Sequence, residues 1–582
     1  MAPSAVEPPS PSPASSRPRV LIPEKVSKEG LALLNSANLD IDFRPQGLSA
    51  EELLSLIPSY HALIIRSETK VTAPVLSAAS KLKVVARAGV GVDNIDVPHA
   101  TSQGIIVVNS PQGNIAAAAE HTIALLLSTA RNIPRGDATL KSSKWERGKL
   151  VGVEVGGKTL GIIGLGKVGM KVARMAIGLS MSVLALDPYA SAEVAKSAGV
   201  QLVKSLDELL PEVDFLTVHT PLLASTLNLL GEGEFGKMKK TARVLNVARG
   251  GVYNEEALLK ALDEGAIAGA GIDVWTQEPP TEGSIPQKLA RHDKVVSTPH
   301  LGASTVEAQE NVSVDVCKQV VEILKGGLPT AAVNAPLILP EEYRRLQPFV
   351  RLIEKMGSLY TQHYAQSRSK QQHQNLLGGR RFELSYHGEL ANISNTRPLF
   401  AALVKGLVSS ISDAGGRDVN IVNATLITQQ RGIAVDEKFI RSPTPTASAV
   451  TLKSSVGEEG GEQVIEGYVS GNNSVFISKL DKFAANFRPE GTLLVLHNYD
   501  EPGKIGHVGS VLGRHGINIT FMQVAGLNRE ARDKLGEEDG PVVEANEALM
   551  ILGVGGQKEV TGELVEELKG QEGILDVSLV RL

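Results

Sequence analysis

The sequence predicts a multidomain α/β protein, and three observations support that fold class. Strand-like and helix-like segments alternate from residue 19 to about residue 335, a pattern that predicts parallel βαβ units. A glycine-rich turn separates a predicted strand from a predicted helix within this region. Residues 489–582 follow the order strand, helix, strand, strand, helix, strand, which is ferredoxin-like. The length of 582 residues leaves room for roughly three to four domains.

The alternation divides into two α/β units in tandem. In the first unit we expect strands at "RVLIPEK", "HALIIRS", "KVVARAGVG" and "GIIVVNS", and helices at "SKEGLALLNSA" and "TAPVLSAASKL". Residues 115–133, "IAAAAEHTIALLLSTARNI", then predict a long helix that is apolar almost all round and therefore buried. The second unit runs from "KTLGIIGLGKVG" to "KVVSTPH".

The character of the chain changes after residue 335. The stretch "GGLPTAAVNAPLILPEEY" holds three prolines and predicts a linker. Residues 336–488 are more polar and contain the loop-like piece "SPTPTASAVTLKSSVGEEGGEQ". We therefore expect a further domain over 336–488 and a separate ferredoxin-like domain over 489–582.

Composition excludes several classes of function. Hydrophobic residues make up 42% and charged residues 21%, which is typical of a soluble globular protein. The net charge of −5 and pI of about 6.2 give no footprint for nucleic acid or an anionic membrane. Cys317 is the only cysteine, so an intrachain disulfide is impossible and a reducing compartment is favoured.

The first 18 residues are rich in proline and serine and lack the apolar region of a secretory signal. We interpret them as a disordered leader of a cytoplasmic protein. Import into a plastid or mitochondrion is the alternative, because serine is abundant and acidic residues are scarce in this stretch.

A dinucleotide site is predicted at "GLGKVG", formed by Gly164, Gly166 and Gly169. The motif follows the apolar strand "LGII" and precedes the helix "KVARMAIGL", as this type of turn requires. The first glycine permits the tight turn, the second lets the backbone approach a pyrophosphate, and the third lets the helix pack against the strand. An ordinary glycine-rich turn is the alternative.

Asp187 ends the next predicted strand, 18 residues after Gly169. A carboxylate there accepts hydrogen bonds from the ribose hydroxyls and repels a 2′-phosphate, so we predict NAD rather than NADP. Taken alone, this aspartate could equally cap a helix or shape the turn before Pro188.

Three more stretches follow predicted strands, where open α/β sheets bind ligands. They supply Arg249 in "VLNVARGG", Asp273 and Glu278 in "GAGIDVWTQEPP", and His300 in "VVSTPHLGAS". A histidine suits removal of a hydroxyl proton near neutral pH, and a carboxylate on its far nitrogen fixes its tautomer. A guanidinium binds a carboxylate with two parallel hydrogen bonds. We therefore predict a hydride-transfer dehydrogenase with Arg249, Glu278 and His300 as its catalytic residues, although each could singly be structural.

The combination of "GLGKVG", "VARGG", "GIDVWTQEPP" and "STPHLGAST" resembles the D-isomer-specific 2-hydroxyacid dehydrogenases over about residues 18–335. The resemblance implies a Rossmann NAD-binding domain over 111–300 and a split, flavodoxin-like substrate domain over 19–110 and 301–335. It also implies cofactor contacts, besides the three glycines, at Lys167, Val168, Asp187, Thr220, Val247, Ala248, Arg249, Asp273, His300, Leu301, Gly302 and Ala303.

Further stretches, "LIIRSETKVTAPVL" and "VVARAGVGVDNIDV" among them, resemble the long-form phosphoglycerate dehydrogenases of that family, which also carry an ACT domain. The stretches "YHGELANISNTRPLFAALVKGL" and "VNIVNATLITQQRGI" resemble the intervening allosteric substrate-binding domain of that form, which implies an α+β domain over 336–488. The resemblance implies oxidation of 3-phosphoglycerate to 3-phosphooxypyruvate, the first step of serine synthesis. Such a substrate needs several anion contacts. We predict them at Arg66 and Arg87, at a cradle of backbone amides from Gly89, Val90 and Gly91, and at Asn109.

The ferredoxin-like unit resembles an ACT domain, which implies an amino-acid effector, serine by resemblance. Its polar contacts fall on Asn498, Asp500 and Asn518. Two departures stand out: Asn498 replaces a tyrosine often found there, and "NREARDKLGEEDGPVVEANE" predicts a longer hairpin insert. Such sites usually form across two domains, so a homodimer or homotetramer is implied.

Two other readings remain at this point. One is a different 2-hydroxyacid dehydrogenase, such as a hydroxypyruvate or glyoxylate reductase, although those lack the C-terminal domains. Formate dehydrogenases carry glutamine in place of Glu278, which argues against that branch. The other is a non-enzymatic NAD-sensing binding protein built on the same scaffold.

Overall fold

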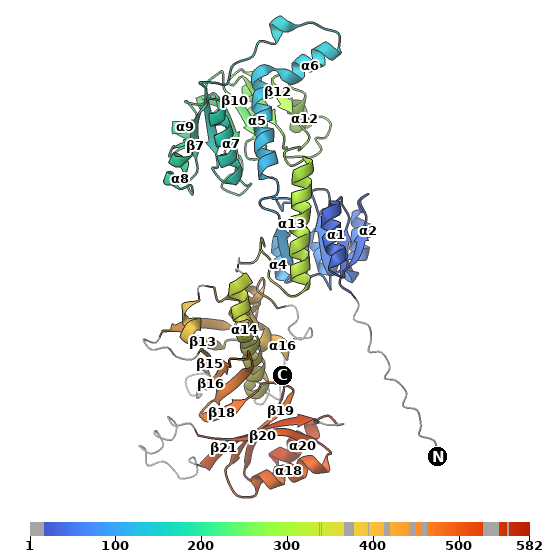
Figure 1. The fold of residues 1–582 in the computed structure, drawn as a ribbon, viewed down its shortest axis with the longest axis vertical. Helices are drawn as coiled ribbons and strands as arrows, with labels where there is room; N and C mark the ends of the chain where they lie inside the picture. Colours follow the sequence, from blue (N-terminus) through green and yellow to red (C-terminus); the bar gives the residue numbers. More distant parts are fainter. Residues whose placement is uncertain are drawn as a thin grey trace, which may run out of the picture.

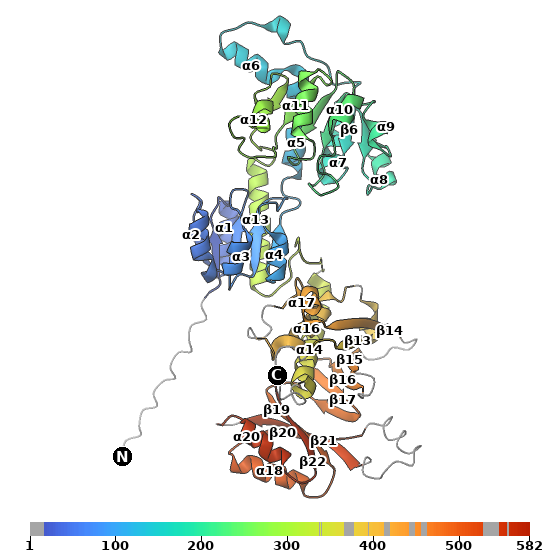
Figure 2. The ribbon, with the colours of Figure 1, turned by 180° about the vertical axis from the view of Figure 1, so that it is seen from behind.

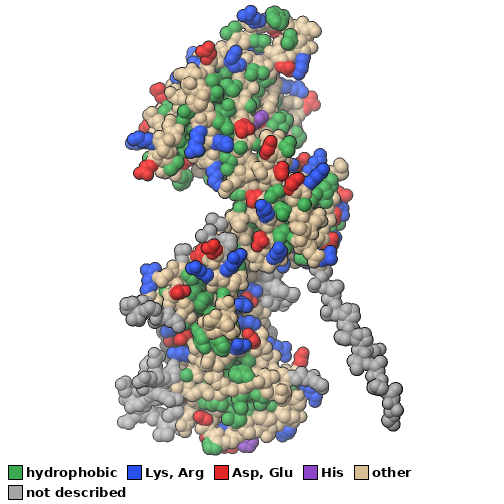
Figure 3. All heavy atoms as spheres, viewed as in Figure 1, with side chains coloured by type: hydrophobic (Ala, Val, Ile, Leu, Met, Phe, Trp, Pro, Cys, Tyr) green, Lys and Arg blue, Asp and Glu red, His purple; other side chains and the backbone are tan. Residues whose placement is uncertain are grey.

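The computed structural model describes residues 17–336, 338, 340–365, 377–393, 395–412, 419–441, 448–455, 462–527, 546–555 and 558–582. Most of the predicted leader (1–16) and of the predicted hairpin insert (528–545) lies outside the described residues. Within the described ranges the chain forms four sheets that follow one another along the molecule (Figures 1 and 2). Positive and negative side chains are interspersed over the face shown in Figure 3, as the small net charge suggests.

The first sheet has the order β2-β1-β3-β4-β5, and all of its strand pairs are parallel. Its central strands are fully buried apolar runs, as expected where helices cover both faces. The helix α13 (Val306–Leu324) returns to this sheet and packs beside α1 (Lys28–Ser36), as the resemblance implied. The other elements are β1 (Arg19–Ile22), β2 (Asp40–Phe43), α2 (Ala50–Leu56), η1 (Ile57–Ser59), β3 (Ala62–Ile65), α3 (Ala73–Ala78), β4 (Val84–Arg87), α4 (Val97–Ser102) and β5 (Ile106–Asn109).

The second sheet has the order β12-β11-β10-β9-β6-β7-β8 and is also parallel throughout. Chain order reverses at β6, which lies between β7 and β9, and ligands bind beyond the carboxyl ends of strands at such a point. Its elements are β6 (Thr159–Ile163), α7 (Lys167–Gly178), β7 (Ser182–Leu186), α8 (Ala192–Ser197), β8 (Gln201–Leu202), α9 (Leu206–Leu209), β9 (Phe215–Val218), α10 (Glu232–Lys237), β10 (Arg243–Asn246), α11 (Glu255–Asp263), β11 (Gly269–Ile272), α12 (Ile285–Ala290) and β12 (Val295–Ser297).

The long predicted helix is α5 (Ile115–Arg131), and the expectation that it is buried all round was wrong. Leu125 and Leu126 lie on the face that packs against the second sheet, whereas Ala116 and Ala124 on the other side are exposed. Beyond it a protruding arm carries α6 (Ile133–Lys141) and η2 (Arg147–Lys149). In the part of the chain that is described, no helix is long and apolar enough to cross a membrane.

The third sheet, of order β14-β13-β15-β16-β17-β18, is mixed, and α14 (Pro340–Tyr360) and α16 (Arg397–Ser409) pack on it. This is the α+β arrangement expected of the intervening region. The remaining elements are η3 (Thr361–Ala365), β13 (Arg381–His387), η4 (Gly388–Asn392), α17 (Ala424–Arg431), β14 (Ala434–Ile440), β15 (Ala449–Ser455), β16 (Gln463–Val469), β17 (Val475–Leu480) and β18 (Phe483–Phe487).

The fourth sheet has the order β20-β21-β19-β22, and its strand pairs are antiparallel, which confirms the ferredoxin-like prediction. Its helices cover one face, and its other face shares a continuous hydrophobic core with the third sheet. The elements are β19 (Thr492–Tyr499), α18 (Lys504–Arg514), β20 (Asn518–Gly526), β21 (Glu547–Gly555), α20 (Gly562–Lys569) and β22 (Ile574–Arg581).

Candidate active site

A cleft of about 750 Å³ opens between the carboxyl ends of the first two sheets. One wall comes from the loops after β3 and β4, and the other from the loops after β10, β11 and β12. Most of the predicted catalytic and substrate-binding residues line it together: Arg66, Arg87, Gly89, Val90, Gly91, Arg249, Glu278 and His300. The sequence therefore placed these residues at one site although they lie far apart along the chain.

The glycine turn has the geometry that a dinucleotide needs. Gly164 has φ +91°, and a β-carbon on it would lie 2.8 Å from the carbonyl oxygen of His219. A β-carbon on Gly169 would lie 2.2 Å from the oxygen of Gly164, so helix α7 can approach the strand only without a side chain there. Gly166 caps α7 and faces open space, where a pyrophosphate can meet the helix N-terminus.

Asp187 stands at the end of β7, beside this turn. Its carboxylate accepts hydrogen bonds from the N–H of Leu165 at 2.7 Å and of Tyr189 at 2.8 Å, which fix its position. Thr220 follows β9, and its buried hydroxyl has no hydrogen-bond partner among the described residues. Of the two predicted contacts at the start of α7, Lys167 is exposed and Val168 is half-buried. These groups fit NAD, because they combine an unpaired hydroxyl with a carboxylate at the end of the second strand, where ribose hydroxyls are bound.

His300 and Glu278 form a hydrogen-bonded pair in the cleft. The Nδ1 of His300 donates to Oε2 of Glu278 at 2.8 Å, and the N–H of Trp275 donates to Oε1 at 3.0 Å. Burial raises the pKa of Glu278, but the hydrogen bonds from His300 and Trp275 outweigh burial and hold the pKa below its ordinary value. The carboxylate therefore stays ionised and keeps the proton of the imidazole on Nδ1, so that Nε2 is the nitrogen able to accept a proton.

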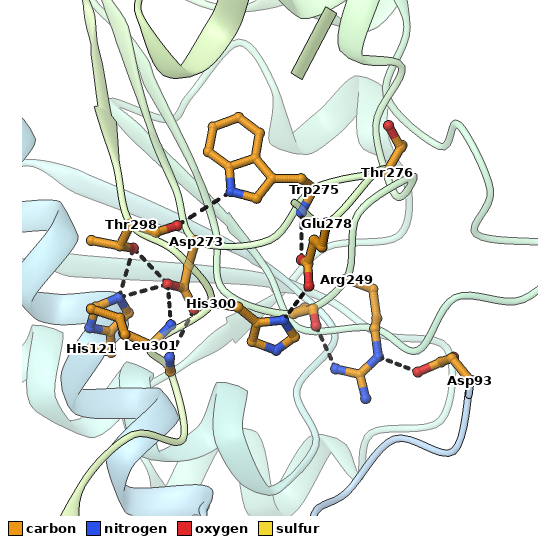
Figure 4. A network of polar contacts seen from close by, with 12 residues as sticks. Asp93, His121, Arg249, Asp273, Trp275, Thr276, Glu278, Thr298, His300 and Leu301 are labelled. Carbon is orange, nitrogen blue, oxygen red and sulfur yellow. Dashed lines mark hydrogen bonds and ion pairs between the residues drawn. The ribbon is translucent and has the colours of Figure 1, made fainter. Parts of the chain in front are cut away.

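Asp273 fixes the loop that carries His300. His300 has φ +55°, a left-handed conformation that costs a residue of this type about 1–3 kcal/mol. The loop is held because the carboxylate of Asp273 accepts the N–H of Leu301 at 2.7 Å and of Gly302 at 2.8 Å. Hydrogen bonds to a charged group contribute about 1.5–3 kcal/mol each, so two of them exceed the cost of the strain. Figure 4 shows this arrangement beside His300.

Asp273 is completely buried and accepts two further hydrogen bonds. Thr298 donates to Oδ1 at 2.6 Å and His121, from α5, donates to the same oxygen at 3.2 Å. Burial raises the pKa of Asp273, but the bonds from His121, Thr298 and Leu301 outweigh burial, and the pKa lies below its usual range. This carboxylate supports the catalytic loop. Its predicted contact with the cofactor stays a prediction, as do those of Leu301, Gly302 and Ala303.

Arg249 reaches the cleft from the turn after β10. The buried Asn246 shapes that turn, since its amide donates to the Arg249 oxygen at 2.8 Å and its oxygen accepts the N–H of Ala248 at 2.9 Å. Val247 lies against Gly302, where a β-carbon would come within 2.8 Å of its side chain. The Nε of Arg249 donates to Asp93 at 3.0 Å, and Asp93 belongs to the opposite wall of the cleft (Figure 4).

The anion cradle predicted over residues 89–91 is only partly present. The N–H of Gly89 already donates to the oxygen of Arg87 at 2.8 Å, so it is not free to bind an anion. A β-carbon on Gly89 would lie 2.3 Å from the guanidinium of Arg87, and one on Gly91 would lie 1.8 Å from that of Arg249. The glycines therefore make room for two arginines.

Asn109 does not line the cleft, contrary to its predicted role as a substrate contact. Its amide donates to the backbone oxygen of Val90 and supports the glycine turn from behind. The strand-end position identified the right edge of the sheet but not the direction of this side chain.

Arg66, Arg87 and Arg249 give the cleft a strongly positive character. Burial, with the charges of Arg249 and Arg66, lowers the pKa of Arg87 to about 10, although Asp93 and Glu24 act in the opposite direction. The Nε atoms of Arg66 and Arg87 are buried and have no hydrogen-bond partner among the described residues. Such groups suit an anionic ligand, which would relieve both their mutual repulsion and their unpaired donors.

Several functional residues were missed from the sequence. Asp93, His121 and Thr298 act through contacts between segments far apart in the chain, which no spacing rule reveals. Lys70, which lines the cleft, could have been found as a cation three residues beyond "RS" in the same loop as Arg66.

A second, smaller cavity of about 350 Å³ lies at the start of α18 in the fourth sheet. Two predicted effector contacts, Asn498 and Asp500, line it, and Asn498 keeps a buried oxygen without a partner among the described residues. Asn518 does not line it, because it lies at the far end of β20, opposite Gly555. Within one chain, the three predicted contacts therefore do not form one site.

The chain matches two protein families. Residues 123–302 match the D-isomer specific 2-hydroxyacid dehydrogenase, NAD binding domain, and residues 345–480 match the D-3-phosphoglycerate dehydrogenase intervening domain. NAD is therefore the cofactor of this dehydrogenase domain, and the fingerprint turn and Asp187 fit it.

Similar proteins span nearly the whole chain. A D-3-phosphoglycerate dehydrogenase of Archaeoglobus fulgidus is 40% identical over 566 residues, which cover 97% of this chain and 100% of that protein. A D-3-phosphoglycerate dehydrogenase of Synechocystis sp. is 42% identical, with 87% of each chain covered. A solved D-lactate dehydrogenase from Aquifex aeolicus, complexed with NAD and lactic acid, is 26% identical with a TM-score of 0.50 and covers 55% of this chain and 99% of its own.

The His300–Glu278 pair generates a direct prediction. Glu278→Gln keeps the size of the side chain but removes the charge that stabilises a protonated imidazole. We expect the turnover number to fall on the order of 100-fold, within the range that general acid–base catalysis contributes, while the Kd for NAD stays within about twofold. Steady-state kinetics and NADH-binding fluorescence measure the two quantities. Wild-type turnover in this variant contradicts the assignment of the pair.

Proposed function

The chain belongs to the D-3-phosphoglycerate dehydrogenase family, and we propose that it oxidises 3-phospho-D-glycerate to 3-phosphooxypyruvate with NAD, the step that opens serine synthesis. The observation that carries the choice of substrate is a set of three arginines in one cleft: Arg66 and Arg87 lie on the wall opposite the His300–Glu278 pair, and Arg249 lies on the same wall as the pair. A substrate with both a carboxylate and a phosphate uses more than one of these cations, whereas a simple hydroxy acid uses only one.

Each residue of the cleft has a separate role that follows from its position. Arg249 holds the substrate carboxylate, and Arg66 and Arg87 hold the phosphate. The Nε2 of His300 removes the proton of the C2 hydroxyl, and ionised Glu278 stabilises the imidazolium that forms. NAD, when bound, accepts the hydride from C2. Asp273 keeps the N–H groups of residues 301 and 302 occupied, so that the loop holds its shape while the charge on His300 changes.

The alternative substrates can be distinguished by the same cleft. A hydroxypyruvate or glyoxylate reductase needs no phosphate contact, so Arg66 and Arg87 would be dispensable for its reaction. A non-enzymatic NAD sensor needs no general base, so the Glu278 hydrogen bond to His300 would have no use. The third sheet favours neither alternative, because the match over residues 345–480 is to a domain of D-3-phosphoglycerate dehydrogenases.

The reaction is tested by NADH formation from purified protein with NAD and 3-phosphoglycerate, with D-glycerate as the matched substrate that lacks only the phosphate. We expect kcat/KM for the phosphorylated acid to exceed that for glycerate by at least about 100-fold, since two charge-assisted contacts contribute roughly 1.5–3 kcal/mol each. Equal values for the two acids, or turnover of glycerate alone, argue for another hydroxy acid.

We further propose that the fourth sheet is an ACT domain that binds serine between two copies of the chain. The cavity beside Asn498 and Asp500 reaches Val524 on β20, which is an edge strand. If two β20 strands pair antiparallel about a twofold axis, Asn518 of the partner subunit approaches this cavity and completes it. Met522 and Val524 are exposed on this edge at 43% and 36%, and pairing would cover them.

The protruding arm supports a second contact between copies. Trp145 and Val151 are 82% and 80% exposed, and Leu140 and Ile133 in the same segment are also exposed. An exposed surface of this kind is typical of a protein–protein contact. Two separate self-complementary surfaces produce a homotetramer, and one alone produces a homodimer.

Met522→Lys tests the ACT proposal, because Met522 lies on the β20 edge but does not line the cavity. A lysine there opposes strand pairing. We expect the oligomer mass from light scattering to halve and inhibition by serine to disappear, with unchanged catalysis in the absence of serine. Leu575→Lys is the matched control, since Leu575 lies on the opposite edge strand of the same sheet with equal exposure of 43%. Retention of serine inhibition by a smaller Met522→Lys species contradicts the shared site.

A further inference from the structure

A buried carboxylate outside the catalytic set holds the loop that carries Arg66. Glu24 follows β1 and is only 5% exposed, and its carboxylate faces the turn that follows β3. Its Oε1 accepts the N–H of Arg66 at 2.9 Å and of Thr69 at 3.0 Å, and its Oε2 accepts the N–H of Glu68 at 3.2 Å. One side chain therefore holds three backbone donors of the four-residue turn.

The side chain of Asn94 holds the same turn by bonding to the backbone carbonyl groups of the turn. Its amide nitrogen donates to the backbone oxygen of Arg66 at 2.8 Å and of Thr69 at 2.7 Å. The backbone oxygen of Asn94 in turn accepts the N–H of Val71 at 2.8 Å, just beyond the turn. The donors and acceptors of Arg66 and Thr69 are thus fixed by two side chains from different loops, an arrangement we call the Glu24–Asn94 clamp.

The clamp acts where the turn meets the cleft. Arg66 lines the cleft, and its Nε is buried without a partner among the described residues, so no side-chain hydrogen bond at that atom sets its direction. The backbone of Arg66 fixes the point from which the side chain enters the cleft, so holding that backbone limits the positions that the guanidinium can reach. A held backbone lowers the entropy that Arg66 loses when it binds an anion, which is the usual benefit of a preorganised site.

Glu24 also places a negative charge near Arg87. The cleft gathers three guanidinium groups, and Glu24 acts on Arg87 in the direction opposite to Arg249 and Arg66. The negative charge of Glu24 therefore offsets part of the repulsion that Arg249 and Arg66 exert on Arg87. The same charge is too deeply buried, at 5% exposure, to bind the substrate itself.

We propose that Glu24 is a positioning residue for substrate binding, which acts through Arg66 by clamping the 66–69 turn together with Asn94. The inference rests on the proposed function only in taking Arg66 as a contact of an anionic substrate. It predicts that loss of the clamp weakens binding of the acid equally in the ground state and in the transition state, which raises KM and leaves kcat unchanged.

Glu24→Gln is the informative variant, because it keeps the length of the side chain but presents an NH₂ group to a backbone N–H. We expect KM for 3-phosphoglycerate to rise about tenfold, kcat to stay within about twofold, and the Kd for NAD to stay unchanged. Asn94→Ala opens the other side of the clamp and should change KM in the same direction, even if Glu24→Gln folds poorly. Glu29→Gln, an exposed glutamate on α1, is the control and should change nothing.

A double-mutant cycle with Arg66→Ala separates positioning from general damage. If Glu24 acts through Arg66, KM of the double variant Glu24→Gln with Arg66→Ala equals that of Arg66→Ala alone within about twofold. A further tenfold rise in the double variant overturns the proposal, as does an unchanged KM in both single clamp variants. Parallel losses in kcat and in NAD affinity also overturn it, because they indicate disruption of the whole domain.

The test of the Glu24–Asn94 clamp can be distinguished from the test of the proposed reaction. If the wild type does not oxidise 3-phosphoglycerate, the proposed function fails, and the clamp is tested through the Kd of 3-phosphoglycerate by calorimetry. About tenfold weaker binding to Glu24→Gln, absent when Arg66 is already alanine, supports the clamp. Equal binding to wild type and Glu24→Gln overturns it.

Discussion

The geometry of the active site depends on the buried carboxylate of Asp273. It lies at the end of β11 and collects hydrogen bonds from α5, from Thr298 and from two successive N–H groups of the catalytic loop. Without a fixed anion at this point, nothing offsets the left-handed conformation of His300, and the imidazole loses its alignment with Glu278. The dehydrogenase chemistry therefore rests on one carboxylate that need not touch the substrate.

A second buried carboxylate holds a loop in the same way on the other wall of the cleft. Glu24 gathers the N–H groups of the turn that bears Arg66, as Asp273 gathers those of the loop that bears His300. In each case an acidic residue that follows one parallel strand accepts hydrogen bonds from the loop that follows the adjacent strand. The loop is therefore held in place although it has no regular secondary structure. The ion pair between Arg249 and Asp93 then links the two walls. A cleft built in this way brings three arginines near one base.

The sequence predicted those features that follow from local pattern. Alternating strands and helices predicted the parallel sheets, and the spacing of Gly164, Gly166 and Gly169 predicted the glycine turn. The residues predicted at strand ends, Arg249, Glu278 and His300, line one cleft. The sequence pattern did not predict the features that depend on tertiary packing. The helix α5 is apolar all round but buried on one side only, and the short polar strand β2 was not anticipated. Asn109 was placed at the correct sheet edge with the wrong role. Asp93 and Glu24 could not be found, because their partners lie in distant segments.

The most direct measurement is the single-turnover rate of NADH formation by Asp273→Asn, at saturating NAD and 3-phosphoglycerate. Asparagine keeps the shape of the side chain but places an amide NH₂ against N–H donors and removes the charge they bind. The account predicts a rate lower than that of the wild type on the order of 100-fold, since the catalytic loop loses charge-assisted bonds of about 1.5–3 kcal/mol each. A rate equal to that of the wild type would contradict it, because His300 would then be held by something other than Asp273.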